Sequence, residues 1–297
     1  YNLDGTGVDV VIQDSGIQAD HPEWEDQNGV SRLKQINWGT ESGLGFQFNS
    51  TNHYRDFHGH GTHVASTIAG KTFGWAKNAN IYALKVAGLE GDGDTGTFGN
   101  PSTVPTQYAF DAIKLWHRNK PIDPKTGHKR PTIVNMSWGY LSTYNTVSSV
   151  NYRGTSTDVS ALSRNQIQSN YGLVNFYSGQ FSAYVTNVRI TSIDTDVEEM
   201  IDEGILVCIA AGNRSHKVDT STGDDYNNTA TTNSGTKTYH RGSSPAHERA
   251  ILVGSLDNNS YSSTQDQKAT YSETGPGVDI WAHGTSIMAA SSNTNAI

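Results

Sequence analysis

Three histidines lie within six residues, in the run His58-Gly-His60-Gly-Thr-His63. Glycines flank His60 on both sides, which would let another backbone approach it closely. A histidine that begins a helix among small neighbours suits a general base that must reach a substrate. A metal site is the alternative, but metal ligands on a helix usually stand four residues apart with an acid nearby. His60 and His63 are three apart with no glutamate between them, so we favour proton transfer over a metallohydrolase.

Two further polar residues directly follow short apolar runs. Asp14 comes after the run 8–13 and precedes Ser and Gly, so its carboxylate could face a cleft at the end of a strand. Asn213 ends the sequence Ala-Ala-Gly-Asn after another apolar run, where a side-chain amide can donate a hydrogen bond to a developing oxyanion. Taken alone, each is also ordinary turn chemistry. Neither residue decides a function by itself.

A third segment, Ser137-Trp138-Gly139, also stands at the end of an apolar run. A segment of this kind can pair with an extended peptide and bind it through backbone groups. An ordinary junction between a strand and a loop is the alternative.

The elements that must position these residues alternate along the chain. Short apolar runs predict strands that are buried on both faces, at Val8–Gln13, Ile81–Val86, Ile133–Met136, Ile205–Ala210 and Ala250–Leu256. Helices are expected between them, at His60–Ala69, Gln107–Arg118 and Asp196–Glu203. This alternation predicts an α/β fold with a doubly wound, mostly parallel sheet flanked by helices. The chemistry of such sheets lies at the carboxyl ends of the strands.

The order of these motifs resembles that of the subtilisin-like serine proteases, the subtilases, from about Asn2 to the last residues. Four segments carry the resemblance: Val10–Ile17 for the aspartate motif, Gly59–Ala65 for the histidine motif, Val134–Gly139 for the substrate strand and Ala210–Asn213 for the oxyanion hole. His21-Pro22 also resembles a downstream pair of the family. The resemblance implies a subtilisin-like fold and a serine endopeptidase that acts on polypeptides.

The resemblance also implies roles for individual residues. Asp14 would accept a hydrogen bond from His60, which would take the proton of the serine nucleophile, and Asn213 would donate to the oxyanion. Arg214 would lie near the primary pocket and disfavour basic side chains there. The residues expected to bind substrate are Ser137, Trp138, Gly139, Ala210 and Gly212.

The nucleophile is where the chain departs from the family. The family serine lies in Gly-Thr-Ser-x-Ala-x-Pro at the start of a long helix, and Gly-Thr-Ser286 is similar. However, Met288 stands where a small residue is expected and Ala290 where proline is expected, and the polar run 291–295 is a poor helix. Gly275–Gly284 instead resembles a family segment that precedes the nucleophile. We therefore expect the serine beyond residue 297, with Ser286 as a doubtful alternative.

Three expectations follow from this alignment. Residues 1–297 alone should be inactive, and a C-terminal fragment of the same protein and a propeptide are possible partners. A catalytically inactive subtilisin-like domain with a binding or structural role is the alternative function. Retention of Asp14, His60 and Asn213 argues against it.

Composition narrows the partners further. The net charge of −8 and the absence of a basic stripe argue against nucleic acid. No apolar run reaches the length of a membrane span, and no signal peptide opens the chain. We expect an extracellular or secreted protein whose targeting segment has been removed.

The whole chain, 1–297, is expected to form a single peptidase domain that is incomplete at its C-terminus. Two polar stretches, at about 140–195 and 215–244, are expected to be surface insertions. No cofactor is required for the chemistry. Structural calcium is possible, since Asp92 and Asp94 supply closely spaced oxygens, although a solvated acidic loop is the more ordinary interpretation.

Overall fold

The structure, a computed structural model, describes residues 3–47, 55–87, 103–178, 181–258 and 266–292 of the chain. The chain divides into two compact units. The first contains residues 1–137, 196–208 and 287–297, and the second contains residues 138–195 and 209–286. The predicted calcium ligands, Asp92 and Asp94, lie outside the described residues.

A parallel sheet forms the centre of the first unit. Strand β1 (Asp9–Asp14) pairs with β3 (Asn80–Lys85) on one side and β4 (Thr132–Met136) on the other, and β2 (Leu33–Lys34) extends the sheet beyond β3. All six residues of β1 are buried, as expected for a strand covered on both faces. The sheet thus presents its central strand's last residue, Asp14, at its carboxyl edge.

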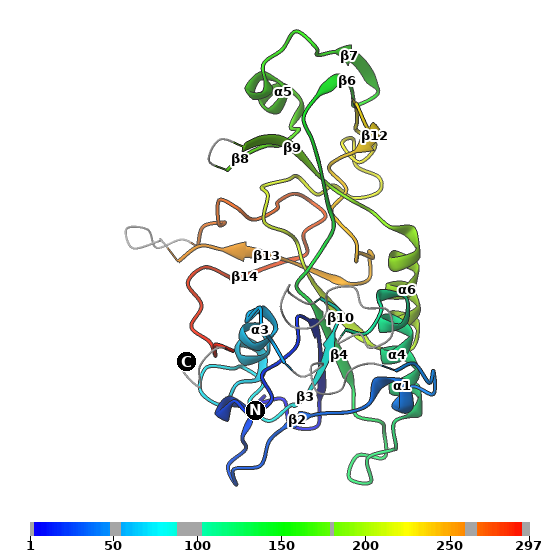
Figure 1. Ribbon diagram of the computed structural model, residues 1–297, viewed down its shortest axis with the longest axis vertical. Helices are drawn as coiled ribbons and strands as arrows, with labels where there is room; N and C mark the ends of the chain where they lie inside the picture. Colours follow the sequence, from blue (N-terminus) through cyan, green and yellow to red (C-terminus); the bar gives the residue numbers. More distant parts are fainter. Residues whose placement is uncertain (1–2, 48–54, 88–102, 179–180, 259–265, 293–297) are drawn as a thin grey trace. The chain divides into compact units, whose positions relative to one another are not determined.

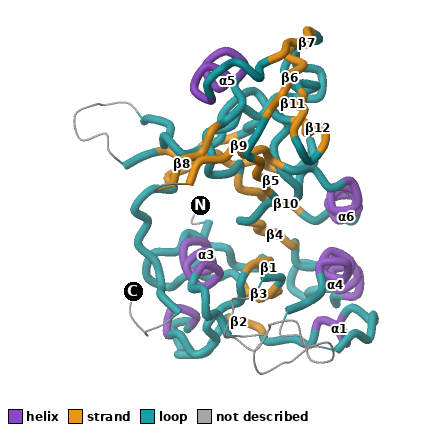
Figure 2. Tube along the Cα trace, turned by 45° about the horizontal axis from the view of Figure 1, so that its top comes forward, coloured by secondary structure: helices purple, strands orange, loops and turns teal. Residues whose placement is uncertain are grey.

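Helices cover both faces of this sheet (Figures 1 and 2). On one face, α3 (His60–Ala69) packs its small residues against β1 in a core that includes Val10 and Ile12. On the other face lie α1 (Trp38–Glu41) and α4 (Thr106–Asn119). There the ring of Trp38 packs edge to face against those of Tyr82 and Trp116, which are tilted against each other, with centroids 4.6–6.5 Å apart. The predicted α/β architecture is confirmed.

Helix α6 (Thr191–Asp202) begins five residues earlier than predicted. Its first turn is rich in β-branched residues, which lower intrinsic helix preference and concealed this turn in the sequence. Its later half belongs to the first unit, where Glu199 pairs with Lys114 and Glu203 pairs with Arg118 of α4. Among the described residues, no helix combines the length and apolar character that crossing a membrane would require.

Strand β10 (Leu206–Ala210) leads from the first unit into the second. The second unit contains a parallel pair, β13 (Ile251–Leu256) and β14 (Ile280–His283), and two small antiparallel sheets. One small sheet has the order β5–β9–β8, with strands Leu141–Tyr144, Phe181–Asn187 and Asn175–Ser178. The other has the order β12–β11–β6–β7, with strands Gly235–Thr238, Thr229–Thr232, Val147–Tyr152 and Thr155–Asp158.

The two stretches that the sequence marks as insertions fold together. Strand β6 comes from the first stretch and β11 from the second, and they pair with Val150 opposite Ala230. Helix α5 (Arg164–Tyr171) buries Ile167 in the same core, which also contains Tyr239. The second stretch therefore completes the sheet and the core of the first.

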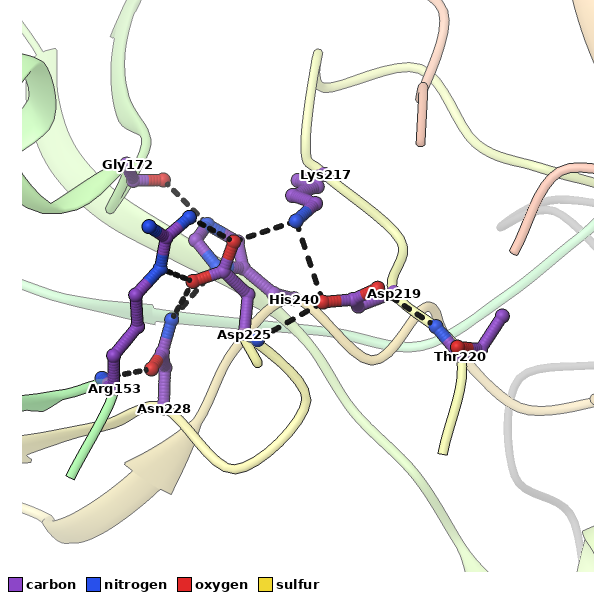
Figure 3. A network of polar contacts seen from close by, with 8 residues as sticks. All are labelled: Arg153, Gly172, Lys217, Asp219, Thr220, Asp225, Asn228 and His240. Carbon is purple, nitrogen blue, oxygen red and sulfur yellow. Dashed lines mark hydrogen bonds and ion pairs between the residues drawn. The ribbon is translucent and has the colours of Figure 1, made fainter. Parts of the chain in front are cut away.

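A polar network also joins these two stretches (Figure 3). The carboxylate of Asp225 accepts two hydrogen bonds from Arg153, at 2.7 and 3.0 Å, and further ones from Lys217 and Asn228. The Arg153 contact is the largest of the influences that hold the pKa of Asp225 well below its usual range. His240 donates from Nε2 to the carbonyl oxygen of Gly172 and accepts from Asn228 at Nδ1. Both oxygens of the Asp225 carboxylate accept hydrogen bonds, as expected for a structural ion pair.

Candidate active site

Asp14 and His60 meet in the first unit. Asp14 is the last residue of β1 and His60 is the first residue of α3. The Nδ1 atom of His60 lies 2.7 Å from Oδ1 of Asp14. The aspartate side chain is 4% exposed, whereas the histidine side chain is 45% exposed. The imidazole therefore has one nitrogen fixed by a buried carboxylate, and the ring still reaches solvent.

Asp56 fixes the backbone around this pair, and the sequence interpretation missed it. Its buried carboxylate accepts hydrogen bonds from the backbone N–H groups of Gly59 and Thr62, both at 2.8 Å, so it satisfies two backbone donors at the start of α3, whose N-cap residue is Gly59. It also accepts from the hydroxyl of Ser15, which in turn accepts from the N–H of Gly61 at 2.9 Å. One carboxylate thus ties the end of β1 to the start of α3. An acidic residue just before a predicted helix was the signal that could have found it.

Gly61 permits the close approach of these two elements. A Cβ atom at this position would lie 2.1 Å from the carbonyl oxygen of Gly16, in the turn that follows β1. No side chain other than hydrogen fits there without separating helix and turn. The glycine after His60 therefore keeps the imidazole within hydrogen-bonding distance of Asp14.

The electrostatics of the pair suit a general base. The hydrogen bond to Asp14 raises the pKa of His60 above its usual value, against the opposing effect of partial burial. The second carboxylate oxygen of Asp14, Oδ2, is buried and has no hydrogen-bond partner among the described residues. The carboxylate charge is thus available to stabilise an imidazolium. When His60 takes up a proton at Nε2, the imidazolium that forms keeps its Nδ1–H beside this carboxylate.

Ser286 does not begin a helix. The described residues 284–292 contain no helix, and Ser286 itself is exposed with a positive φ of 55°. The backbone N–H of Ala290 donates to the hydroxyl of Ser66 at 3.1 Å. The described residues around Ser286 therefore lack the helix that the resemblance implies behind the nucleophile.

The sequence pattern of the subtilase family matches residues 5–297. The chain belongs to the subtilase family. It is 28% identical over 288 residues to "Subtilisin-like protease 5" of Arthroderma benhamiae, an alignment that covers 96% of this chain and 46% of that protein. It is 42% identical over 92 residues to the "Cuticle-degrading serine protease" of Arthrobotrys oligospora, covering 31% of this chain and 20% of that protein. The subtilase chain thus spans about half the length of the first relative and matches a fifth of the second.

Solved structures show the same fold. A cold-adapted subtilisin-like serine proteinase matches with a TM-score of 0.53 at 21% identity, covering 100% of this chain and 69% of the other. Sphericase matches with a TM-score of 0.55 at 20% identity, covering 97% and 70%. The subtilisin-like fold predicted from the motifs is confirmed.

The predicted oxyanion residue of this subtilase lies in the second unit. Asn213 is exposed, in the segment that follows β10. Gly212, before it, has a φ of 121°, in the region that favours glycine. The guanidinium of Arg214 lies 4.5 Å from the ring centre of Phe176, a cation–π contact with β8. The small antiparallel sheet therefore supplies a contact that orients the residue next to Asn213.

The predicted substrate segment follows β4. Ser137 closes the first unit, where its hydroxyl accepts a hydrogen bond from the side chain of Asn135 at 3.0 Å. Trp138 and Gly139 open the second unit, and residues 137–140 belong to no strand. A Cβ atom on Gly139 would lie 2.2 Å from the hydroxyl oxygen of Ser243, so that position also requires a residue without a side chain.

The other two histidines of the cluster have separate surroundings. The ring of His58 stands edge-on to that of His60, with centroids 5.9 Å apart. His63 donates from Nε2 to the carbonyl oxygen of Ile287 at 3.1 Å, because a carbonyl can only accept. Within the described ranges, no three histidine, cysteine, aspartate or glutamate side chains gather as a metal site.

Proposed function

We propose that this subtilase is a serine endopeptidase in which His60 is the general base and Asp14 orients it. The observation that carries the proposal is the 2.7 Å contact between a buried carboxylate and a half-exposed imidazole. With Nδ1 donating to Asp14, Nε2 is free to accept the serine proton and later to return it to the leaving amine. The names of the relatives, subtilisin-like and cuticle-degrading proteases, support hydrolysis of polypeptides.

Asn213 completes the proposed chemistry as the oxyanion donor. Its exposed amide follows a strand and a glycine with positive φ, which suits a side chain that must reach a tetrahedral intermediate. The proposed substrate contacts are the backbone of Ser137–Gly139 and that of Ala210 and Gly212. We also propose that the protein acts outside the cell, that its partners include a propeptide, and that calcium, where bound, is structural.

We propose further that the nucleophile is a serine outside residues 1–297. Ser286 has a left-handed backbone conformation and no helix behind it, and Met288 is 63% exposed where a buried helix would pack. A general base without a serine offers no covalent path. Residues 1–297 alone should therefore hydrolyse no peptide, even though they carry Asp14 and His60.

A fluorophosphonate probe tests this proposal, because it labels only activated serines. The full-length protein should be labelled once, on a serine outside residues 1–297, as located by mass spectrometry. Ser286→Ala should be labelled equally well. Stoichiometric label on Ser286 would restore that residue as the nucleophile. A folded, full-length protein that takes up no label would favour the inactive, binding domain.

A further inference from the structure

A second histidine–carboxylate pair is buried in the second unit, at the turn that carries Asn213. The side chains of His216 and Glu273 are 4% and 0% exposed. The Nδ1 atom of His216 lies 3.0 Å from Oε1 of Glu273, and the backbone N–H of His216 donates to Oε2. The side-chain amide of Asn187 also donates to Oε1, at 3.4 Å. A charged residue is almost never fully buried unless it is paired, and both oxygens of this carboxylate are paired with His216.

Glu273 contacts the chain on both sides of Asn213. The backbone N–H of Glu273 donates to the carbonyl oxygen of Gly212 at 3.2 Å, one residue before Asn213. Its side chain holds His216, three residues after Asn213. The neighbouring backbone bonds, Ser215 to Tyr271 and Thr274 to His216, continue the same pairing. The segment 212–216 is therefore clamped at both ends by residues 271–274.

Packing adds to this clamp. A Cβ atom on Gly212 would lie 2.7 Å from both Cγ and Oε1 of Glu273, so the carboxylate fills the space that a side chain at 212 would occupy. Gly212 therefore suits this position twice, because it tolerates the positive φ and leaves room for the Glu273 side chain.

The ring of His216 has no freedom to exchange a proton with substrate. Its Nε2 lies 3.0 Å from the carbonyl oxygen of Val185 in β9, and a carbonyl only accepts, so Nε2 carries a hydrogen. Its Nδ1 is engaged by Glu273. Both ring nitrogens are therefore used internally, and β9, within the first predicted insertion, anchors the ring.

We infer that His216 and Glu273 are positioning residues that hold the Asn213 amide in place for the oxyanion, with Asn187 and Val185 as their anchors in β9. The inference rests on the proposed function, because it requires Asn213 to act on a tetrahedral intermediate. It adds that the small sheet β5–β9–β8 supports the reaction, through the contacts of Asn187 with Glu273 and of Val185 with His216. Oxyanion stabilisation depends strongly on donor position, so a loosened turn should lower kcat rather than raise KM.

A double-mutant cycle on the full-length protein tests this inference, with active sites counted by fluorophosphonate titration so that misfolded protein does not contribute. Asn213→Ala should lower kcat about 100- to 1,000-fold, a range known from subtilisin itself. Glu273→Ala should lower kcat about 10- to 100-fold with little change in KM, as for a misplaced group. In the Asn213→Ala background, Glu273→Ala should cost nothing further, because the amide it positions is gone.

Three variants separate positioning from general support. Glu273→Gln keeps an acceptor for the N–H of His216 and should retain most of the wild-type kcat. His216→Ala should act in the same direction as Glu273→Ala, and it serves if that variant fails to fold. Arg153→Ala, the matched control, breaks the Asp225 network in the same unit and should lower thermal stability without changing kcat per active site (Figure 3).

The outcomes distinguish two failures. An enzyme that is sensitive to Asn213→Ala but keeps wild-type kcat in Glu273→Ala would overturn this inference alone, as would equal losses for Glu273→Ala in both backgrounds. Wild-type kcat in Asn213→Ala would overturn the oxyanion assignment itself and this inference with it.

Discussion

The chain contains two histidine–carboxylate pairs with similar contacts and opposite surroundings. His60 and Asp14 are joined at 2.7 Å in the first unit, and His216 and Glu273 at 3.0 Å in the second. The ring of His60 is 45% exposed, whereas that of His216 is 4% exposed. His216 uses both ring nitrogens internally, and Glu273 accepts hydrogen bonds at both oxygens. In the first pair, one oxygen of Asp14 has no partner among the described residues.

The difference in exposure between the two pairs shows that a hydrogen bond between a histidine and a carboxylate does not by itself make the histidine a general base. A general base must exchange its proton with a substrate, which requires one accessible nitrogen and a pKa near the working pH. The first pair offers an accessible nitrogen, and the hydrogen bond to Asp14 raises the pKa of His60, whereas the second pair is closed by Val185 and Asn187. In the second pair, the imidazole and the carboxylate are buried and their polar atoms are bonded within the protein, so the pair holds a turn in place and exchanges no proton with substrate.

The largest expected effect comes from removing the accessible imidazole. His60→Ala should lower kcat/KM by more than about 1,000-fold in the full-length protein, because the nucleophile loses its base. The fold should persist, since the side chain is half exposed. Steady-state kinetics on a peptide substrate provide the measurement, and circular dichroism checks the fold.

His58→Ala is the matched control for this change. His58 lies two residues away and stands edge-on to the ring of His60, whereas the contact with Asp14 belongs to His60, so removal of His58 should leave kcat/KM close to that of the wild type. Equal losses in the two variants would break the comparison and revive a role for the histidine cluster as a whole.

A smaller effect is expected at Asp56, which positions the first pair without touching the imidazole. Asp56→Ala leaves the N–H groups of Gly59 and Thr62 without their acceptor, which should cost about 1–3 kcal/mol of unfolding free energy. It should also lower kcat, because the start of α3 carries His60. Urea unfolding and kinetics measure the two effects.

Asp225→Ala sharpens this test. Asp225 is equally buried and bonded, but it belongs to the network of the second unit (Figure 3). It should lower stability and leave kcat per active site unchanged. If Asp56→Ala lowered stability alone, Asp56 would be a structural residue like Asp225.

The smallest effect is expected at Arg214, beside the clamped turn. Its guanidinium is held over Phe176, next to Asn213, where a cation would disfavour basic P1 side chains and tolerate acidic ones. Arg214→Ala should therefore increase cleavage after Lys and Arg relative to Glu. Profiling P1 preference on a peptide library measures this ratio, and identical profiles would remove Arg214 from specificity.

How much could be predicted depends on the range of the interactions. Helix α3 and strand β1 matched the prediction to within one residue, because their periodicity and glycines are local signals. The pairing of Asp14 with His60 was available from the family motifs, and the two side chains lie 2.7 Å apart in the structure. The pairing of β6 with β11 was not, since it joins segments about eighty residues apart whose alternation is weak in Thr and Ser.

Of the two carboxylates that support the site, the role of Glu273 could not be predicted from the sequence, whereas that of Asp56 could. Glu273 follows the ordinary sequence Thr-Tyr-Ser, and nothing local marks its carboxylate as buried against Gly212. The role of Asp56 was recoverable, because an acid precedes a helix start. Buried partners of this kind become visible only when the fold brings distant segments together.

The central claim, that His60 held by Asp14 is the working base, is tested most directly by the pH dependence of His60 itself. Diethyl pyrocarbonate modifies only neutral imidazole, and peptide mapping by mass spectrometry reports His60 separately, even in inactive variants. The hydrogen bond to Asp14 raises the pKa of His60, so half-maximal modification should occur above pH ~6.5, the usual value for histidine. Because the pKa of His60 is higher in the folded state, its protonation stabilises the fold below pH ~6.5. This stabilisation is lost as the pH rises through the raised pKa of His60.

In the wild type, kcat/KM should rise with pH to half its maximum at the same pH at which modification of His60 is half-maximal. In Asp14→Asn that midpoint should fall, because the charge that favours the imidazolium is gone. Glu273→Gln should leave it unchanged. A midpoint that is the same in Asp14→Asn, or a kcat/KM limb that does not follow His60, would contradict the account.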